Sequence, residues 1–207
     1  MKSKHQGLVN PPHYTAGITA GSLLIHESRT VASLLLNGVE PDEIKSRIIS
    51  ENLFHKRSPQ TSKRLCLLIL GRLSLVNRKF WLMISDGPQP LTKQALLACS
   101  IKHSRLLGDF MRDVLVRRAK THDDQLHHGD WERFFETCEL IDPEVSKLRE
   151  STRKKLRQVV IRILIESGYL ENHRSLKLTP IMIEPDIRKL LVENQEKYVL
   201  KCMEVYE

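Results

Sequence analysis

The stretch Ser151–Leu170, STRKKLRQVVIRILIESGYL, combines a helical apolar pattern with dense positive charge. Its apolar residues recur at intervals of three and four positions, which is the spacing of a buried helical stripe. They are Leu156, Val159, Val160, Ile163 and Leu164. Ser151 is suited to the N-cap, and Gly168 is suited to the left-handed residue after the last turn. The pattern therefore predicts one amphipathic helix that ends before Gly168.

Positive charge is concentrated at the start of this predicted helix. The cations are Arg153, Lys154, Lys155 and Arg157. They lie where exposed N–H groups already make the helix end positive and where Asp or Glu is usually favoured. A bound phosphate would offset this repulsion. The alternative is an ordinary solvated face, because Lys and Arg side chains also cover apolar surface well.

After Gly168 the helical period gives way to a short hairpin pattern. Tyr169-Leu-Glu and Leu176–Leu178 flank a polar turn at 172–175. A basic helix followed by a small hairpin is typical of a winged helix-turn-helix, in which the helix enters a DNA groove and the hairpin contacts the backbone. We therefore expect a small C-terminal β-wing that carries Arg174 and Lys177.

The N-terminal half contains a second group of predicted helices. A helix over 22–36 ends at Asn37-Gly38, and Pro41 begins the next helix. Ser58 and Pro59 are suited to the cap and the first position of a third helix. The buried stripe of the third helix is Leu65, Leu68, Ile69 and Leu73. The candidates for contact with base edges or phosphates are Lys56, Arg57, Ser58, Gln60, Thr61, Lys63 and Arg64. A plain three-helix bundle is the alternative.

A turn-rich break at Asp86–Pro90 predicts a domain boundary. The helical period from about Thr92 to Lys120 predicts one long helix beyond it. The expected organisation is a flexible N-terminus, a helix-turn-helix-like domain, and a long central helix with a winged-helix-like domain, over residues 1–14, 15–86 and 87–207. The expected fold class is therefore mainly α, with helix-turn-helix-like units at both ends joined by a long central helix.

The composition indicates a polyanionic partner. The 207-residue chain has a formal net charge of +8 and a pI near 9.4, which favours nucleic acid or an anionic surface. An aromatic content of 5% is low and disfavours an aromatic stacking platform for single strands. The longest apolar run, Leu65–Leu70, is far below the ~20 residues needed to span a bilayer. We expect a soluble, cytoplasmic protein without a membrane partner.

Motifs for catalysis and cofactor binding are absent from the sequence. G-x-x-x-x-G-K-[ST], H-E-x-x-H and G-x-S-x-G do not occur. The four cysteines form no C-x-x-C pair, which excludes a zinc ribbon and indicates buried, reduced thiols. The run His122–Asp130 holds His and carboxylate side chains, but its polar, loop-like character favours solvated surface over a metal site. We expect no enzymatic activity, no cofactor and no bound metal.

Six further segments follow one another in a specific order along the chain. They are Tyr14–Arg29, Glu51–Thr61, Ile101–Asp113, Glu150–Lys155, Glu166–Leu170 and Tyr198–Val205. Together they resemble the BrxA family, the small accessory proteins of BREX (bacteriophage exclusion) defence systems. The segments cover nearly the whole chain, so the resemblance is to the full protein. It implies a bacterial, cytoplasmic, non-enzymatic protein that works beside a methyltransferase, an ATPase and a phosphatase-like subunit in resistance to bacteriophage.

The charge pattern and the resemblance together favour an accessory protein that binds double-stranded DNA. Binding is expected mainly through phosphates, with little base specificity. The expected contacts are Lys56, Arg57, Ser58, Gln60, Thr61, Lys63, Arg64, Arg153, Lys154, Lys155, Arg157, Arg174 and Lys177. One alternative is an RNA-binding, antitermination-like factor. Another is a scaffold whose basic faces bind other BREX subunits.

Overall fold

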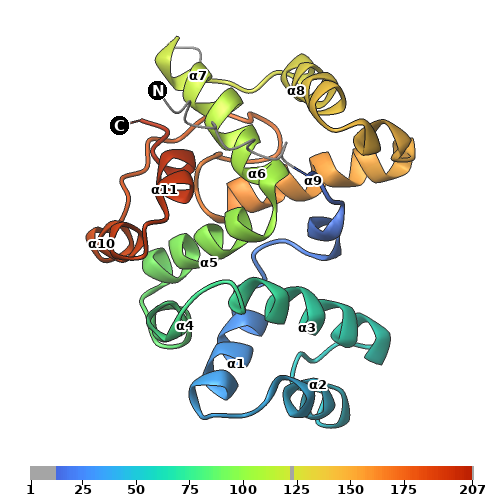
Figure 1. Ribbon diagram of the computed structural model, residues 1–207, viewed down its shortest axis with the longest axis vertical. Coiled ribbons are helices and arrows are strands. Elements are labelled where there is room, and N and C mark those ends of the chain that lie inside the picture. Colours follow the sequence, from blue (N-terminus) through green and yellow to red (C-terminus); the bar gives the residue numbers. More distant parts are fainter. Residues whose placement is uncertain (1–12, 122–123, 207) are drawn as a thin grey trace, which may run out of the picture.

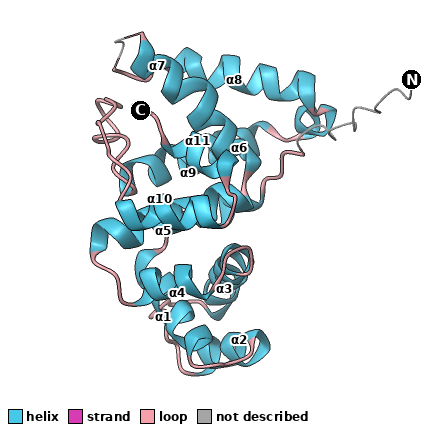
Figure 2. Ribbon diagram, turned by 60° about the vertical axis from the view of Figure 1, so that its left-hand side comes forward, coloured by secondary structure: helices cyan, strands magenta, loops and turns pink. Residues whose placement is uncertain are grey.

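The computed structural model of the chain describes residues 13–121 and 124–206. It is mainly helical, as predicted, with α1–α4 at one end of an elongated molecule and α5–α11 at the other (Figure 1). Helices and loops account for the whole described chain, which contains no strand (Figure 2). None of the described helices is both long enough and apolar enough to cross a membrane.

The lower end in Figure 1 is built from helices that pack on one another around α1. They are α1 (Ile25–Leu36), α2 (Pro41–Ser50), α3 (Pro59–Leu73) and α4 (Arg78–Ser85). The predicted starts at Pro41 and Pro59 are confirmed, and so is the buried stripe of α3. The predicted start of α1 was wrong, because Leu24 has a left-handed backbone with φ of 56° and the helix begins only after it.

The predicted continuous helix over 92–120 was wrong, because the chain changes direction at Ser104. The observed elements are α5 (Gln89–His103), α6 (Arg105–Phe110), the π-helical turn η2 (Met111–Leu115) and α7 (Val116–Lys120). Ser104 has an extended backbone, with φ of −131° and ψ of 101°, and its hydroxyl accepts a hydrogen bond from the N–H of Leu107. Serine favours caps over helix interiors for this reason.

The upper end consists of helices that surround α5 and α6. They are α8 (His128–Ile141), the 3-10 turn η3 (Pro143–Lys147), α9 (Glu150–Glu166), α10 (Pro185–Glu193) and α11 (Lys197–Met203). The predicted buried stripe of α9 is confirmed, and Gly168 has the expected positive φ, at 91°. The predicted cap was wrong by two residues, because Arg149 and not Ser151 is the N-cap.

The predicted β-wing was also wrong. The segment 171–178 is a loop with isolated bridges, Leu170 to Leu178 and Gln125 to Lys177, and no strand forms in the described chain. Leu176 has a left-handed backbone with φ of 49°, which interrupts the extended conformation that a strand requires. Pro180 follows without an N–H to donate, so the pairing does not extend past the bridges.

The N-terminal segment is part of the packed structure from Tyr14 onward. Of the residues predicted to be flexible, 1–12 lie outside the described residues, whereas Tyr14 is buried. Its N–H donates to Asp142 at 2.9 Å and its hydroxyl donates to Asp109 at 2.9 Å. The 3-10 turn η1 (Gly17–Ala20) follows and packs against α3 and α9. The predicted division of the chain at 86/87 stays a prediction.

Asp109 on α6 receives several of these contacts. Its side chain is 2% exposed and accepts from the hydroxyls of Tyr14 and Tyr198 and from the guanidinium groups of Arg105 and Arg112, each at 2.9 Å. Arg105 also lies over the ring of Tyr198, 3.9 Å from its centroid. A methyl group at the preceding residue, Gly108, would collide with the Tyr198 hydroxyl, so glycine permits the close approach of α11 to α6.

We predict that Gly108→Ala destabilises the fold. The new Cβ would lie 2.9 Å from Cζ of Tyr198 and closer still to its hydroxyl, and overpacking of this kind costs about 1–3 kcal/mol of unfolding free energy. Urea denaturation followed by circular dichroism would measure it. The control is Gly129→Ala on α8, whose Cβ meets only the flexible end of Arg133. Equal stability of the two variants would contradict the prediction.

Candidate nucleic-acid interface

The predicted N-terminal candidates come together at the start of α3. Pro59 begins the helix and the apolar stripe faces the core, so the remaining positions face outward. A shallow concavity there is lined by Ser58, Gln60, Thr61, Lys63, Arg64 and Leu67. We call this group, with Lys56 and Arg57, the α3 cluster. Its first-turn N–H groups face no acidic side chain of the same turn, because α3 has none there.

The cations of the α3 cluster differ in availability. Arg57, Lys63 and Arg64 are exposed and form no ion pair with a described acidic residue. Lys56 is half-buried, and its ammonium pairs with Glu27 of α1 at 2.7 Å. Three cations of this cluster are therefore free to contact an anion, whereas Lys56 would have to exchange the carboxylate of Glu27 for a phosphate.

A second group of cations lies on the outward face of α9. A concavity of about 430 Å³ between this helix and the loop 171–178 is lined by Lys154, Arg157, Gln158, Ile161, Arg162, His173 and Leu176. We call these residues, with Lys155 and Arg174, the α9 cluster. Sequence reasoning named Lys154 and Arg157 but missed Arg162, although its spacing of four from Gln158 places it on the same helical face. It also missed His173, because only the fold brings that loop to α9.

Arg153 lies in the same turns of α9 but is turned inward. Its guanidinium donates to the carbonyls of Ser146 and Leu148, pairs with Glu139 of α8 at 2.6 Å, and lies over the ring of Phe135. These contacts attach the start of α9 to α8 and η3. A nucleic acid would have to displace Glu139 to reach this side chain.

Two other predicted cations have exposed partners. Lys154 pairs with Glu150 one turn earlier at 2.6 Å, and this hydrogen bond lowers the pKa of Glu150 and raises the pKa of Lys154. Lys177 pairs with Asp124 at 3.2 Å. Exposed pairs of this kind contribute little to stability, so a phosphate can take the place of either carboxylate. Lys155, Arg157 and Arg174 have no described acidic partner.

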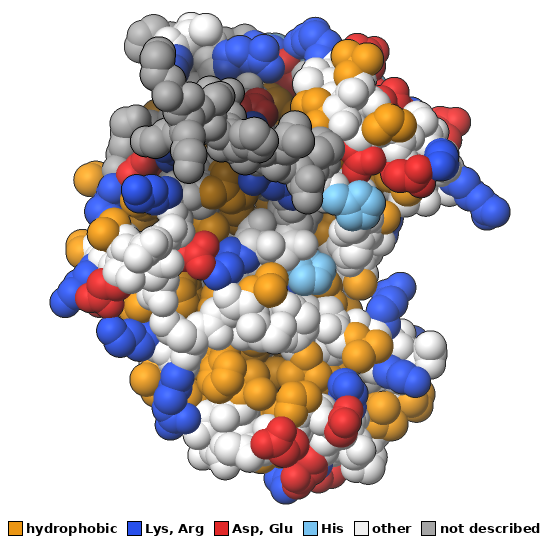
Figure 3. Space-filling model, viewed as in Figure 1, with side chains coloured by type: hydrophobic (Ala, Val, Ile, Leu, Met, Phe, Trp, Pro, Cys, Tyr) orange, Lys and Arg blue, Asp and Glu red, His pale blue; other side chains and the backbone are white. Residues whose placement is uncertain are grey.

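The N-terminal ends of the two helices that carry these clusters lie toward the same side of the molecule. The N-terminal ends of α3 and α9 both point to the right in Figure 1. On that side, Lys and Arg side chains border an indentation of the surface, above it and below it (Figure 3). One extended polyanion can therefore approach both helix ends from one direction.

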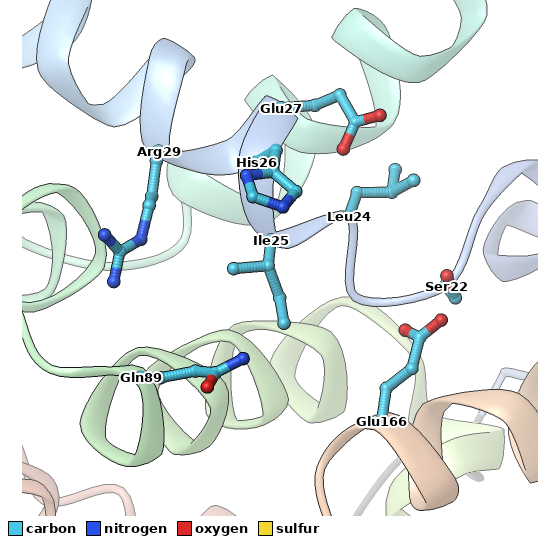
Figure 4. A pocket seen from close by; sticks show the side chains of 8 residues that line it. All are labelled: Ser22, Leu24, Ile25, His26, Glu27, Arg29, Gln89 and Glu166. Carbon is cyan, nitrogen blue, oxygen red and sulfur yellow. The ribbon is translucent and has the colours of Figure 1, made fainter.

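A further concavity, about 500 Å³, lies elsewhere, between the starts of α1 and α5 and the end of α9 (Figure 4). Its charged side chains already have partners, although the Nε of Arg29 is buried without one. Glu166 accepts from the N–H of Leu23 at 2.9 Å, Glu27 pairs with Lys56, and Arg29 donates to the carbonyl of Gly87. The described residues hold no group of His, Cys, Asp or Glu that could bind a metal. This concavity therefore offers no excess of positive charge to a phosphate.

Alanine substitutions of Arg153 and Lys155 are expected to differ in their effect on the free energy of unfolding. Arg153→Ala removes charged hydrogen bonds and should lower the unfolding free energy by about 1–3 kcal/mol. Lys155→Ala removes an exposed side chain without a described partner and should change it by less than about 0.5 kcal/mol. Thermal or urea unfolding of both variants measures the difference. Equal effects would mean that the inward contacts of Arg153 are unimportant.

Comparison with known proteins places this chain in one family, by matches that span most of its length. The BrxA family model matches residues 12–195. A BREX protein BrxA from Paramagnetospirillum magneticum is 38% identical over 94% of this chain and 98% of its own length. A BREX protein BrxA from Bacillus cereus is 30% identical over 81% of this chain and 84% of its own length.

A solved structure supports the same assignment. The crystal structure of an uncharacterized protein from Magnetospirillum magneticum has a TM-score of 0.85 and 36% sequence identity to this chain. The match covers 94% of this chain and 100% of that one. Because the family model, the relatives and the fold all span most of the sequence, the chain belongs to the BrxA family of BREX proteins.

Proposed function

We propose that this chain is a double-stranded DNA-binding accessory protein of a BREX phage-defence system. The observation that supports it is a pair of cation clusters, one at the N-terminal end of α3 and one along the outward face of α9, on helices whose N-terminal ends point to one side of the molecule. Phosphates of a duplex recur along its length, so one duplex can supply anions to both helix ends.

Helix geometry adds to the side-chain charge at both ends. The first N–H groups of a helix carry partial positive charge and are a common site for phosphate. At α3 no acidic residue of the first turn competes for them. At α9 the acidic residue of the first turn, Glu150, is already paired with Lys154 on the surface. Both ends therefore favour an external anion.

The expected recognition is of the backbone more than of the bases. Seven cations of the two clusters have no described acidic partner: Arg57, Lys63, Arg64, Lys155, Arg157, Arg162 and Arg174. Lys and Arg on flexible side chains chiefly position a protein on phosphates, whereas paired contacts to base edges are needed to specify sequence. Gln60 and Thr61 add hydrogen-bonding groups at one end of α3 only.

The salt dependence of DNA binding tests this proposal. If about six phosphates are neutralised, the logarithm of the affinity should fall with the logarithm of salt at a slope of about −5. Fluorescence anisotropy with duplexes of unrelated sequence would measure the slope. A slope near zero would contradict binding through phosphates, and stronger binding of structured RNA at equal salt would reassign the polyanion to RNA.

Charge-reversal variants distinguish the contribution of the two clusters to DNA affinity from that of the net positive charge of the protein. The double variants Lys63→Glu/Arg64→Glu and Lys155→Glu/Arg157→Glu should each weaken duplex binding at least tenfold and make the salt slope shallower by about 2. The matched control is Lys197→Glu/Lys201→Glu on α11, which removes the same charge from exposed positions outside both clusters. An equal loss of affinity in the control would show that only net charge matters.

A further inference from the structure

The concavity of the α9 cluster has two walls from different parts of the chain. Arg157 and Arg162 come from α9, and His173 comes from the loop 171–178. Between these walls the lining is apolar: Ile161 is buried on α9, and Leu176 is half-buried on the loop. The concavity thus combines groups that can carry positive charge with an apolar interior.

The loop wall is held in place by hydrogen bonds. The side-chain oxygen of Asn172 accepts from the N–H groups of Arg174 and Ser175, and the Gln125 amide donates to the carbonyl of Ser175. The N–H of Leu126 donates to the carbonyl of Leu176, whose φ is 49°. A non-glycine residue stays in this conformation only where its surroundings enforce it, and such residues are found most often at binding sites. The concavity is therefore formed before any ligand arrives.

The charges of the concavity favour an anion. Arg157 and Arg162 have no described acidic partner, and the single carboxylate beside Lys154 is the exposed Glu150. Guanidinium groups bind phosphate oxygens with paired hydrogen bonds and also stack on flat rings. The ligand is thus expected to carry both a phosphate and a flat, poorly charged part.

From this combination we propose that the concavity binds a single unpaired nucleotide. Its phosphate would contact Arg157 and Arg162, and its base would lie against Ile161 and Leu176. A volume of about 430 Å³ is in the range of small-molecule sites. The paired bases of a blunt duplex are stacked inside the helix and cannot enter it, whereas a base at a strand end or on a free nucleotide can. The strand-end form of the proposal rests on the proposed DNA binding.

Overhang preference tests the proposal. The affinity of a duplex with a short single-stranded overhang is compared with that of a blunt duplex with as many added phosphates, so that charge is matched. The expected preference for the overhang is about tenfold, from the burial of one base against Ile161 and Leu176. Deoxyadenosine monophosphate, titrated by calorimetry, is the probe for the free nucleotide, and Arg162→Gln should weaken its binding.

Two variants test whether the overhang preference arises in the concavity or elsewhere on the surface. Gln158→Glu places a carboxylate inside the concavity, which repels the phosphate there, and should reduce the overhang preference to about one. Thr137→Glu, at an exposed position on α8, is the control with the same change of charge and should keep the preference. Circular dichroism establishes that both variants fold.

The outcomes distinguish this inference from the proposed function. Nucleotide binding without an overhang preference assigns the concavity to a free nucleotide. An overhang preference without binding of the free nucleotide assigns it to a strand end. No preference and no nucleotide binding by the wild-type chain would overturn the inference. Because the affinity for the blunt duplex is measured in the same series, DNA binding through phosphates is judged separately from either result.

Discussion

The buried carboxylate of Asp109 is the interaction on which the arrangement of the upper helices depends. It accepts hydrogen bonds or ion pairs from Tyr14, Arg105, Arg112 and Tyr198. A carboxylate removed from water is tolerated only when it is paired and hydrogen-bonded. Its four donors come from the N-terminal segment, the region of α6 and η2, and α11. Movement of any of these elements would remove part of the compensation of a buried charge, so the three are held in one arrangement.

The same constraint extends to the two cationic helices through the segment after Tyr14. This segment packs against α3 and α9 and then donates the N–H of Leu23 to Glu166 at the end of α9. Arg72 of α3 donates to the carbonyl of Ser22 in the same segment, and burial lowers the pKa of this arginine to about 10. The positions of α3 and α9 are thus related through the chain between them, which donates to one helix and accepts from the other.

The parts of this structure that could be predicted from sequence are those set by local signals. The stripes of α3 and α9 and their Pro and Gly boundaries act within a few residues. The break at Ser104 could not be predicted, because the apolar period continues through it, and the left-handed Leu176 depends on hydrogen bonds from residues about fifty positions away. The chemistry of the candidate site was predictable from cations outside the stripes. The inward pairing of Arg153 with Glu139 was not, because it requires the position of α8.

The helices of this chain differ in how they satisfy their N-terminal ends, and the difference bears on function. In α8, Asp130 accepts from the N–H of His127 and also pairs with Arg118 and Arg133, so the positive end has an internal anion. The first turn of α2 likewise contains Asp42 and Glu43. The first turn of α3 contains no acid and is surrounded by exposed cations. The pair of Lys56 with Glu27 relieves only part of the repulsion at that end, and a bound phosphate would supply at α3 the negative charge that Asp130 supplies at α8.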